Sequence, residues 1–212
     1  MIKILLADDH PYLRRGLIQI LTDEFPGAMI GEASNVPELL EHARKQLWDV
    51  VVLDLTMPGR DGLEALHELK RLYPSLPVLV LSMHPEDQFA VRVLRAGGAG
   101  YLTKESVPQV LVQAIKAVWR GGKYITPKTA ALLAAYLHQH GDNEQSPHAA
   151  LSDREYQVFR LIAAGRTITD ISDQLSLSVK TVSTYRSRIL AKLNLKTNVD
   201  VARYAVEHRL LE

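Results

Sequence analysis

The sequence of 212 residues predicts an α/β domain on a parallel sheet, followed by a smaller all-α domain. In residues 1–120, short apolar runs alternate with stretches whose apolar residues recur every three or four positions. This pattern is typical of strands alternating with helices, and it favours a parallel sheet with right-handed crossovers. In residues 149–212 only the helical spacing occurs. We interpret residues 121–148 as a linker that contains one helix.

Composition and charge exclude several classes of protein. The chain has no cysteine, which excludes disulfides, thiolate metal sites and cysteine nucleophiles. No apolar run approaches the ~20 residues of a membrane span, so we expect a soluble, cytoplasmic protein without a membrane partner. Residues 1–120 have a net charge of −2, whereas residues 149–212 have +3. This asymmetry indicates that the C-terminal part meets a polyanion.

Five short apolar runs predict the strands, and helical patterns fall between them. The strands are expected at residues 4–7, 29–33, 50–53, 78–81 and 101–103. The helices are expected near residues 11–21, 37–43, 62–72, 89–94 and 107–119. Residues 50–53 are β-branched or leucine throughout, which predicts a strand buried on both faces.

The strand ends share a chemical character. They carry Asp8, Asp9, Asp54, Ser82 and Lys104. Each residue alone has an ordinary interpretation: a helix cap for the aspartates at 8 and 9, a turn for Asp54 or Ser82, a solvated charge for Lys104. Together they lie at the carboxyl edge of one sheet, where ligands collect. Converging carboxylates favour a Mg²⁺ ion, which would also draw a phosphoryl group toward a carboxylate nucleophile.

Residues 1–120 resemble a response-regulator receiver domain. The matching stretches are residues 6–10 (LADDH), 53–62 (LDLTMPGRDG), 81–82 (LS) and 100–104 (GYLTK). The resemblance implies a doubly wound, five-stranded fold of flavodoxin-like type. It also implies site roles: Asp54 as phosphoacceptor, and Asp8, Asp9 and Asp54 as Mg²⁺ ligands with the backbone carbonyl of Thr56. Ser82 would be the switch hydroxyl, Tyr101 the aromatic that rotates with it, and Lys104 the phosphoryl partner.

Tyr101 and the histidines of the linker each have an alternative interpretation. Tyr101 is equally explained as a half-buried core aromatic. Beyond it, residues 126–137 predict a further helix, and residues 138–148 are polar and read as a mobile linker. His138, His140 and His148 could suggest a metal site, but we interpret them as solvated linker residues.

The second half predicts four helices in a helix-turn-helix pattern. Ser152 and Glu155 form the sequence signature of a capping box, and Ser178 is expected to cap the third helix. Between Asp173 and Asp200 there is no acidic residue. The same interval contains the basic residues Lys180, Arg186, Arg188, Lys192 and Lys196. A basic helix is typical of phosphate contacts, although a solvated helix face is the alternative.

This half resembles the LuxR-type helix-turn-helix of NarL/FixJ-type regulators. Residues 151–155 (LSDRE), 164–165 (AG) and 178–182 (SVKTV) carry the match. The sequence departs from the family pattern at Ser183, where Lys is common, and at Tyr185, where His is common. The expected DNA-binding residues are Lys180, Thr181, Ser183, Thr184, Arg186, Ser187, Arg188 and Lys192. Short hydroxyls read bases weakly, so the target sequence is not deducible.

The two resemblances together imply a phosphorylation-dependent regulator of transcription rather than an enzyme. A sensor histidine kinase would phosphorylate Asp54, and a homodimer would form and bind double-stranded DNA. One alternative is a DNA-binding regulator whose receiver is silent. Another is a Mg²⁺-dependent phosphohydrolase, which would need a dedicated acid or base beside the nucleophile.

Overall fold

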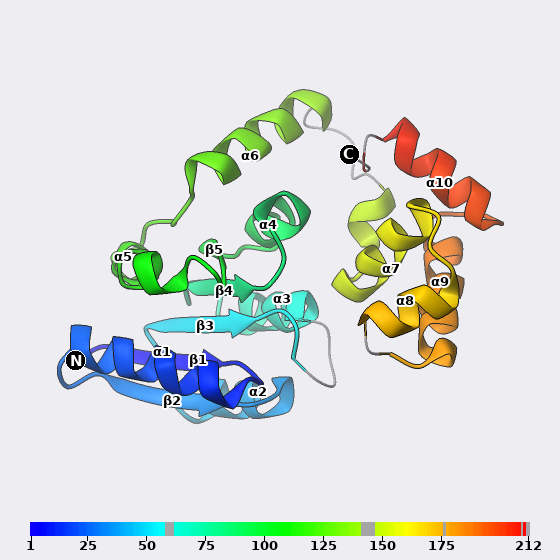
Figure 1. Ribbon diagram of the computed structural model, residues 1–212. Helices are drawn as coiled ribbons and strands as arrows, with labels where there is room; N and C mark the ends of the chain where they lie inside the picture. The colour runs from blue at the N-terminus through cyan, green and yellow to red at the C-terminus, as the bar shows by residue number, and fades with distance from the viewer. Residues whose placement is uncertain (58–61, 141–146, 176, 209, 211–212) are drawn as a thin grey trace. The chain divides into compact units, whose positions relative to one another are not determined.

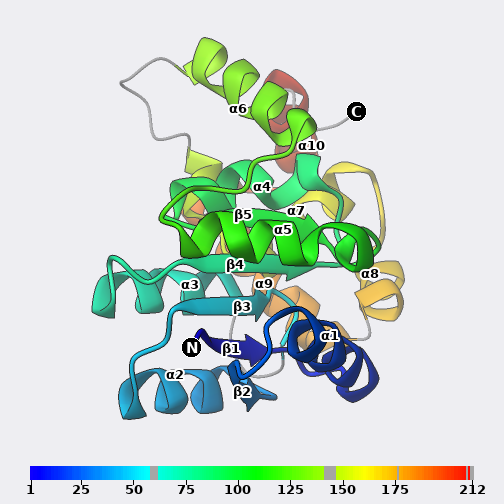
Figure 2. The same cartoon turned by 90° about the vertical axis from the view of Figure 1, so that its left-hand side faces the viewer.

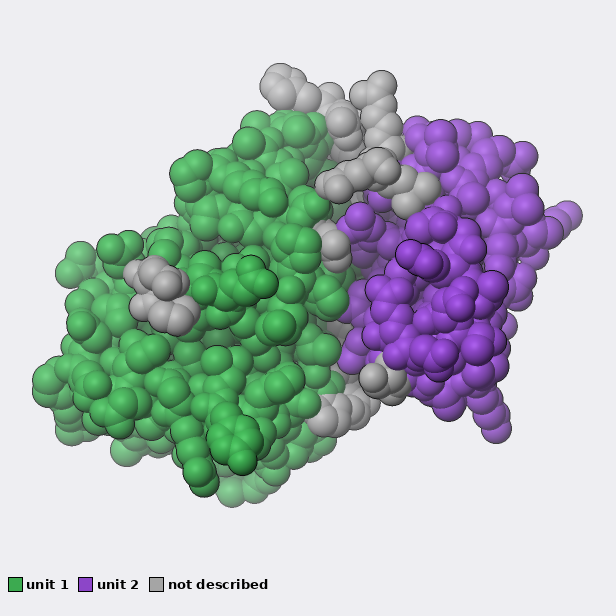
Figure 3. Space-filling model, in the orientation of Figure 1, with its two compact units in different colours: residues 1–142 green, residues 143–212 purple. Residues whose placement is uncertain are grey.

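The chain divides into two compact units, Met1–Asp142 and Asn143–Glu212 (Figure 3). The computed structural model describes residues 1–57, 62–140, 147–175, 177–208 and 210. The motif residues 58–61 therefore lie outside the described residues. Within these described ranges, every helix is too short or too polar to cross a membrane.

The first unit is built on a parallel sheet of five strands. They are β1 (Lys3–Ala7), β2 (Met29–Ala33), β3 (Val50–Asp54), β4 (Val78–Ser82) and β5 (Gly100–Thr103). Their spatial order is β2-β1-β3-β4-β5, and every neighbouring pair is parallel. Every residue of β3 and β4 is buried. The predicted doubly wound, flavodoxin-like fold is confirmed.

Helices cover both faces of this sheet, which is why its central strands are apolar throughout. α1 (Pro11–Glu24) and α5 (Val107–Trp119) lie on one face (Figures 1 and 2). There Leu17 and Leu111 join a core with Leu6 and Val52. α2 (Val36–Lys45), α3 (Gly62–Leu72) and α4 (Glu86–Arg95) cover the other face, in contact with β1, β3 and β5 respectively. Alternate residues of each strand therefore enter two separate cores.

A further helix, α6 (Pro127–His140), packs on α4 in the first unit. Both Thr126 and Thr129 donate hydroxyl hydrogen bonds to Oε2 of Glu86, at the start of α4; the Thr129 bond measures 2.6 Å. Farther along, the guanidinium of Arg95 lies 4.9 Å from the ring centroid of Tyr136. Polar and cation–π contacts thus hold α6 at both ends of α4.

The second unit consists of four α-helices and a short 3-10 helix. They are η1 (Pro147–Ala150), α7 (Asp153–Ala163), α8 (Ile168–Leu175), α9 (Val179–Lys192) and α10 (Asn198–Glu207). The expected capping box of Ser152 and Glu155 is present, and Ser178 accepts the expected bond from the N–H of Thr181. Thr197 and Asp200 form a second capping box at α10, which we did not predict.

The interpretation of His148 as a solvated linker residue is wrong. Its side chain is 8% exposed, and its Nδ1 lies 3.1 Å from the hydroxyl of Tyr204 on α10. The polar sequence around His148 gave no sign of this, because its partner is 56 residues away. His138 and His140 belong to α6, and their side chains lie outside the description.

Candidate functional site

The carboxyl edge of the sheet gathers charged side chains from three strands. Asp8 follows β1, Asp54 ends β3 and Lys104 follows β5. Since the strands are parallel, their carboxyl ends lie at the same edge. The side chains of Asp8 and Asp54 are 0% exposed, and Lys104 is 8% exposed. Buried charges of this kind require partners, because desolvation without pairing costs several kcal/mol.

Lys104 provides that pairing. Its Nζ lies 2.7 Å from Oδ2 of Asp54 and 2.8 Å from Oδ2 of Asp8. The backbone N–H of Thr56 donates to Oδ1 of Asp54 at 3.0 Å. Each oxygen of Asp54 therefore faces a donor, and the carboxylate is fixed in orientation at the end of β3.

The pKa values of the pair follow from burial and charge. Burial raises the pKa of Asp54, and the ammonium of Lys104 offsets only part of that effect. For Lys104, burial alone would lower the pKa, but the carboxylates of Asp54 and Asp8 outweigh it and raise the pKa. Lys104 thus keeps its positive charge beside the acids.

The acidic pocket has the donor atoms that a hard dication requires. One donor atom from each of Asp8, Asp9, His10 and Asp54 lies within 4.8 Å of the others. Three are carboxylate oxygens, the ligand type that Mg²⁺ prefers. The residues present therefore fit a divalent cation. Thr56 directs its N–H to Asp54, and its carbonyl stays a predicted ligand.

Ser82 and Tyr101 are connected through one backbone segment. Ser82 ends β4, one residue after Leu81, which is the register partner of Asp54 on β3. The Oγ of Ser82 accepts a hydrogen bond from the N–H of His84 at 3.1 Å. The Tyr101 hydroxyl donates to the carbonyl of His84 at 2.8 Å. Tyr101 is 1% exposed, so here it is a fully buried aromatic rather than a half-buried one. Both predicted switch residues thus hold the same turn after β4.

Two residues that the sequence reasoning did not assign also touch the pocket. The guanidinium of Arg14 donates to the carbonyl of Asp8 at 2.6 Å, and its Nε pairs with Glu32 at 2.9 Å. The Nδ1 of His10 lies 2.8 Å from Oδ1 of Asp9. The sequence signal for His10 was its position directly after the two aspartates. For Arg14 the sequence gives no signal beyond its position one turn into α1.

The basic helix of the second unit presents only part of its charge to solvent. Lys180 and Arg188 are exposed. Nε of Arg186 donates to Oδ1 of Asn198 at 2.6 Å. Nζ of Lys192 lies 2.6 Å from the buried carboxylate of Glu155. Lys192 therefore has a structural partner, which leaves less of its charge for a phosphate.

Three of the hydroxyls predicted to face DNA have partners in α9 or in its N-cap. Thr184 donates to the carbonyl of Lys180 at 2.9 Å, and Ser187 donates to that of Ser183 at 3.0 Å. The Thr181 hydroxyl lies 2.8 Å from that of Ser178 in the cap. Each of these hydroxyls keeps acceptor capacity for a donor from a base or a water.

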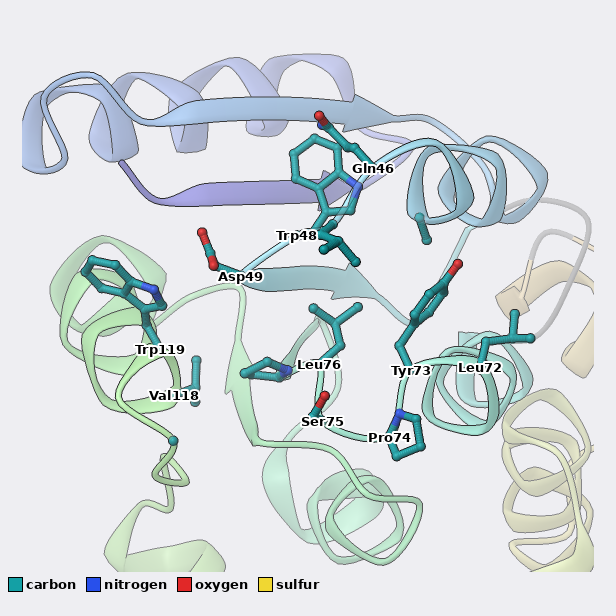
Figure 4. Close-up of a pocket in the computed structure, with 14 residues that line it drawn as sticks. Gln46, Trp48, Asp49, Leu72, Tyr73, Pro74, Ser75, Leu76, Val118 and Trp119 are labelled. Carbon is teal, nitrogen blue, oxygen red and sulfur yellow. The ribbon is translucent and has the colours of Figure 1, made fainter.

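A separate cavity of about 500 Å³ opens at the amino ends of β3 and β4 (Figure 4). It is lined by Trp48 and Asp49 before β3, by Tyr73 and Leu76 before β4, and by Trp119 at the end of α5, among others. Because the strands are parallel, this cavity lies at the opposite edge of the sheet from Asp54.

Comparison with known proteins finds matches to both units. Residues 4–116 match the family described as "Response regulator receiver domain", and residues 149–205 match "Bacterial regulatory proteins, luxR family". Response regulator UvrY of Escherichia coli K12 is 39% identical over 99% of this chain and 96% of its own. Response regulator GacA of Pseudomonas aeruginosa is 41% identical over 100% of this chain and 99% of its own.

A solved structure extends the likeness to the fold. It is RcsB of Salmonella enterica serovar Typhimurium bound to promoter rprA in the presence of the phosphomimetic BeF3⁻. It has a TM-score of 0.58 and 27% identity, and it covers 96% of this chain and 98% of that one.

Proposed function

This chain belongs to the NarL/FixJ-type response regulators, DNA-binding two-component regulators that control transcription, and from that premise we propose that Asp54 is its phosphoacceptor. The observation that carries the proposal is the buried contact between Asp54 and the Lys104 ammonium. A carboxylate oriented by a cation and a backbone N–H at a sheet edge is placed to receive a phosphoryl group. The domain boundaries proposed are 1–120, 121–148 and 149–212.

The transfer itself needs few groups. An oxygen of Asp54 forms a bond to phosphorus while the bond between phosphorus and the histidine nitrogen of a sensor kinase breaks. The leaving imidazole retains the electron pair and takes a proton from solvent. Lys104, now 2.7 Å from Asp54, meets the phosphoryl oxygens as a point charge. Asp8 and Asp9 would hold Mg²⁺ with Asp54 and the Thr56 carbonyl; when bound, the ion neutralises charge that resists the incoming phosphoryl group.

The signal would leave the site through the turn that follows β4. Ser82 exchanges its bond with the N–H of His84 for one to the phosphoryl group, and Tyr101 loses or shifts its bond to the carbonyl of His84. The next residues begin α4, whose Glu86 holds the two threonines of α6. Phosphorylation would shift the population between two conformations of the turn. The contacts of Glu86 with the two threonines of α6 would change with it.

The output is proposed to be a cytoplasmic homodimer on double-stranded DNA. In a helix-turn-helix the second helix of the motif, here α9, enters the major groove, and a dimer matches a two-fold site. The exposed Lys180 and Arg188 are the first candidates for phosphate contacts. Thr181, Ser183, Thr184, Arg186 and Ser187 remain predicted contacts, and Lys192 is the weakest because it pairs with Glu155.

The test is the DNA affinity of the full-length protein with and without acetyl phosphate and Mg²⁺, on a site selected from random DNA. We expect phosphorylation to raise the affinity by about 5- to 150-fold, the usual range of coupling between sites. Asp54→Asn should bind DNA without that gain, and Asp23→Asn, at an exposed aspartate of α1, should behave as wild type. An equal gain in Asp54→Asn would overturn the assignment. Beryllofluoride without effect on affinity or dimerisation would instead support a silent receiver.

A further inference from the structure

His10 belongs to the acidic cluster itself, because its ring nitrogen is among the donor atoms that lie close together. Its Nδ1 is 2.8 Å from Oδ1 of Asp9, 3.1 Å from Oδ1 of Asp8 and 3.8 Å from Oδ2 of Asp54. One nitrogen thus faces three carboxylates of three different residues, and it also lies 3.4 Å from Nζ of Lys104. The backbone N–H of His10 donates to Oδ1 of Asp8 at 2.7 Å, which fixes the residue at this place before α1 begins.

These separations are those of atoms that share one ion. Six donors around a cation at 2.0–2.1 Å stand roughly 3 Å apart along the edges of the octahedron and roughly 4 Å apart across it. The distances from Nδ1 to Asp9 and Asp8, 2.8 and 3.1 Å, are close to the edge length, and the 3.8 Å to Asp54 is close to the length across. Two of them, 2.8 Å to Asp9 and 3.1 Å to Asp8, are also the length of a hydrogen bond. An imidazole that only donates to the carboxylates, or only accepts a hydrogen bond from Lys104, is therefore the alternative that an experiment must separate.

The other nitrogen in the pocket is of a different kind. Nζ of Lys104 is an ammonium paired with Asp54 and Asp8, and it has no lone pair to offer to a metal. His10 can offer one. Imidazole suits the later first-row transition ions, whose affinity for a nitrogen ligand rises from Fe²⁺ through Co²⁺ to Cu²⁺, whereas carboxylates suit Mg²⁺ and Mn²⁺. A fourth ligand from His10 would therefore change which ion the site prefers.

We infer that His10 is a metal ligand through Nδ1, and that it gives the acidic cluster a preference for first-row transition dications such as Co²⁺ over Mg²⁺ beyond that of the carboxylates alone. This inference rests on the proposed phosphoacceptor site and specifies its cation. The side chain of His10 is 56% exposed, so its removal leaves no buried cavity and the variant should fold.

The experiment measures ion binding by the full-length protein, after removal of any histidine tag. Mg²⁺, Mn²⁺ and Co²⁺ are titrated separately by calorimetry into wild type, His10→Ala and the control His67→Ala, whose residue is exposed on α3. Loss of the ligand should weaken Co²⁺ binding by at least the roughly 10- to 100-fold that follows loss of an outer-shell partner. Mg²⁺ binding should change far less, and His67→Ala should match wild type.

A second readout detects the bond directly. Pulsed electron paramagnetic resonance of bound Mn²⁺ should show ¹⁴N coupling in wild type and His67→Ala, and none in His10→Ala or His10→Asn. Wild type without nitrogen coupling, or equal loss of Mg²⁺ and Co²⁺ affinity in His10→Ala, overturns the inference. If acyl-phosphate still forms with Mg²⁺ in that case, only the role of His10 fails. If wild type binds none of the three ions, the proposed metal site fails as well.

Discussion

Nζ of Lys104 lies 2.7 Å from Oδ2 of Asp54, although the two residues are 50 positions apart in the chain. The contact joins the ends of β3 and β5 across β4, and both side chains are nearly fully buried. It places beside the proposed acceptor a fixed cation, which stabilises the buried carboxylate and can later face a phosphoryl group.

The first prediction concerns this pair. In the presence of a chelator, Lys104→Ala should lower the free energy of unfolding by about 3–5 kcal/mol, because it leaves two buried carboxylates without their cation. Mg²⁺ should restore part of the lost stability by replacing the positive charge.

Both tryptophans of the chain, Trp48 and Trp119, lie in the first unit, so their fluorescence in urea reports the unfolding of this unit alone. The control Lys116→Ala breaks a solvent-exposed pair with Glu24 and should cost less than about 1 kcal/mol. Equal losses would contradict the account.

The second prediction concerns the turn after β4. Tyr101→Phe removes the hydroxyl that bonds the carbonyl of His84, so it should lower the free energy of unfolding by about 1 kcal/mol. Asp54, Lys104 and the proposed metal ligands are unchanged, so acyl-phosphate labelling should persist. The gain in DNA affinity with beryllofluoride should shrink if Tyr101 transmits the signal. An unchanged gain would leave Tyr101 as a core aromatic only.

The third prediction concerns α6. Glu86→Ala removes the acceptor shared by Thr126 and Thr129, so the start of α6 should open more often. Amide hydrogen exchange in α6 should accelerate by at least about tenfold, because the loss of even one of the two hydrogen bonds is equivalent to about 1.4 kcal/mol. The control Glu64→Ala changes an exposed glutamate of α3. If exchange in α6 is the same in both variants, the threonine contacts do not hold the helix.

The fourth prediction is a pH dependence in the second unit. Burial would raise the pKa of Glu155, but the ammonium of Lys192 and the N–H of Ser152 outweigh it and lower the pKa below the ordinary glutamate value of 4.5. The unfolded chain then binds the proton first, so the stabilisation is complete above pH 4.5 and is lost as pH falls through the lowered pKa. Hydrogen exchange of α7 and α9, corrected for intrinsic rates, should show this loss in wild type and less of it in Glu155→Gln. Identical profiles would refute the coupling.

The fifth prediction separates two basic residues of α9. Arg188→Ala should weaken DNA binding at every sequence and reduce the slope of log affinity against log salt by about one, as expected for one lost phosphate contact. Lys192→Met should leave that slope nearly unchanged, because its ammonium pairs with Glu155. It should instead lower the stability of the second unit by about 1–3 kcal/mol, since Glu155 is 2% exposed. The reverse pattern would restore Lys192 as a DNA contact.

The fold could be predicted from the sequence because the patterns that indicate strands and helices are local. Apolar runs and helical spacing predicted all five strands and the helices of both units, with ends displaced by a few residues, as at α2, which begins at Val36 because Asn35 caps it. The convergence of Asp8, Asp54 and Lys104 could also be predicted, because the carboxyl ends of parallel strands lie at the same edge of the sheet.

What escaped prediction depends on contacts between distant residues. Nothing in the polar stretch around His148 indicates that Tyr204 covers it. The basic residues of α9 look alike in sequence, and only the structure separates Lys192, held by Glu155, from the exposed Arg188. His10 was next to the aspartates, yet the direction of its ring toward three carboxylates depends on how α1 follows β1.

The most direct test of the central claim is to locate the phosphoryl group itself. Full-length protein is incubated with acetyl phosphate and Mg²⁺, and the acyl-phosphate is trapped by reduction and mapped by mass spectrometry. The account predicts one labelled residue, Asp54, and no label in Asp54→Asn, with the fold of the variant unchanged by circular dichroism. Label on another residue of the wild type, or label that persists in a folded Asp54→Asn, would contradict it.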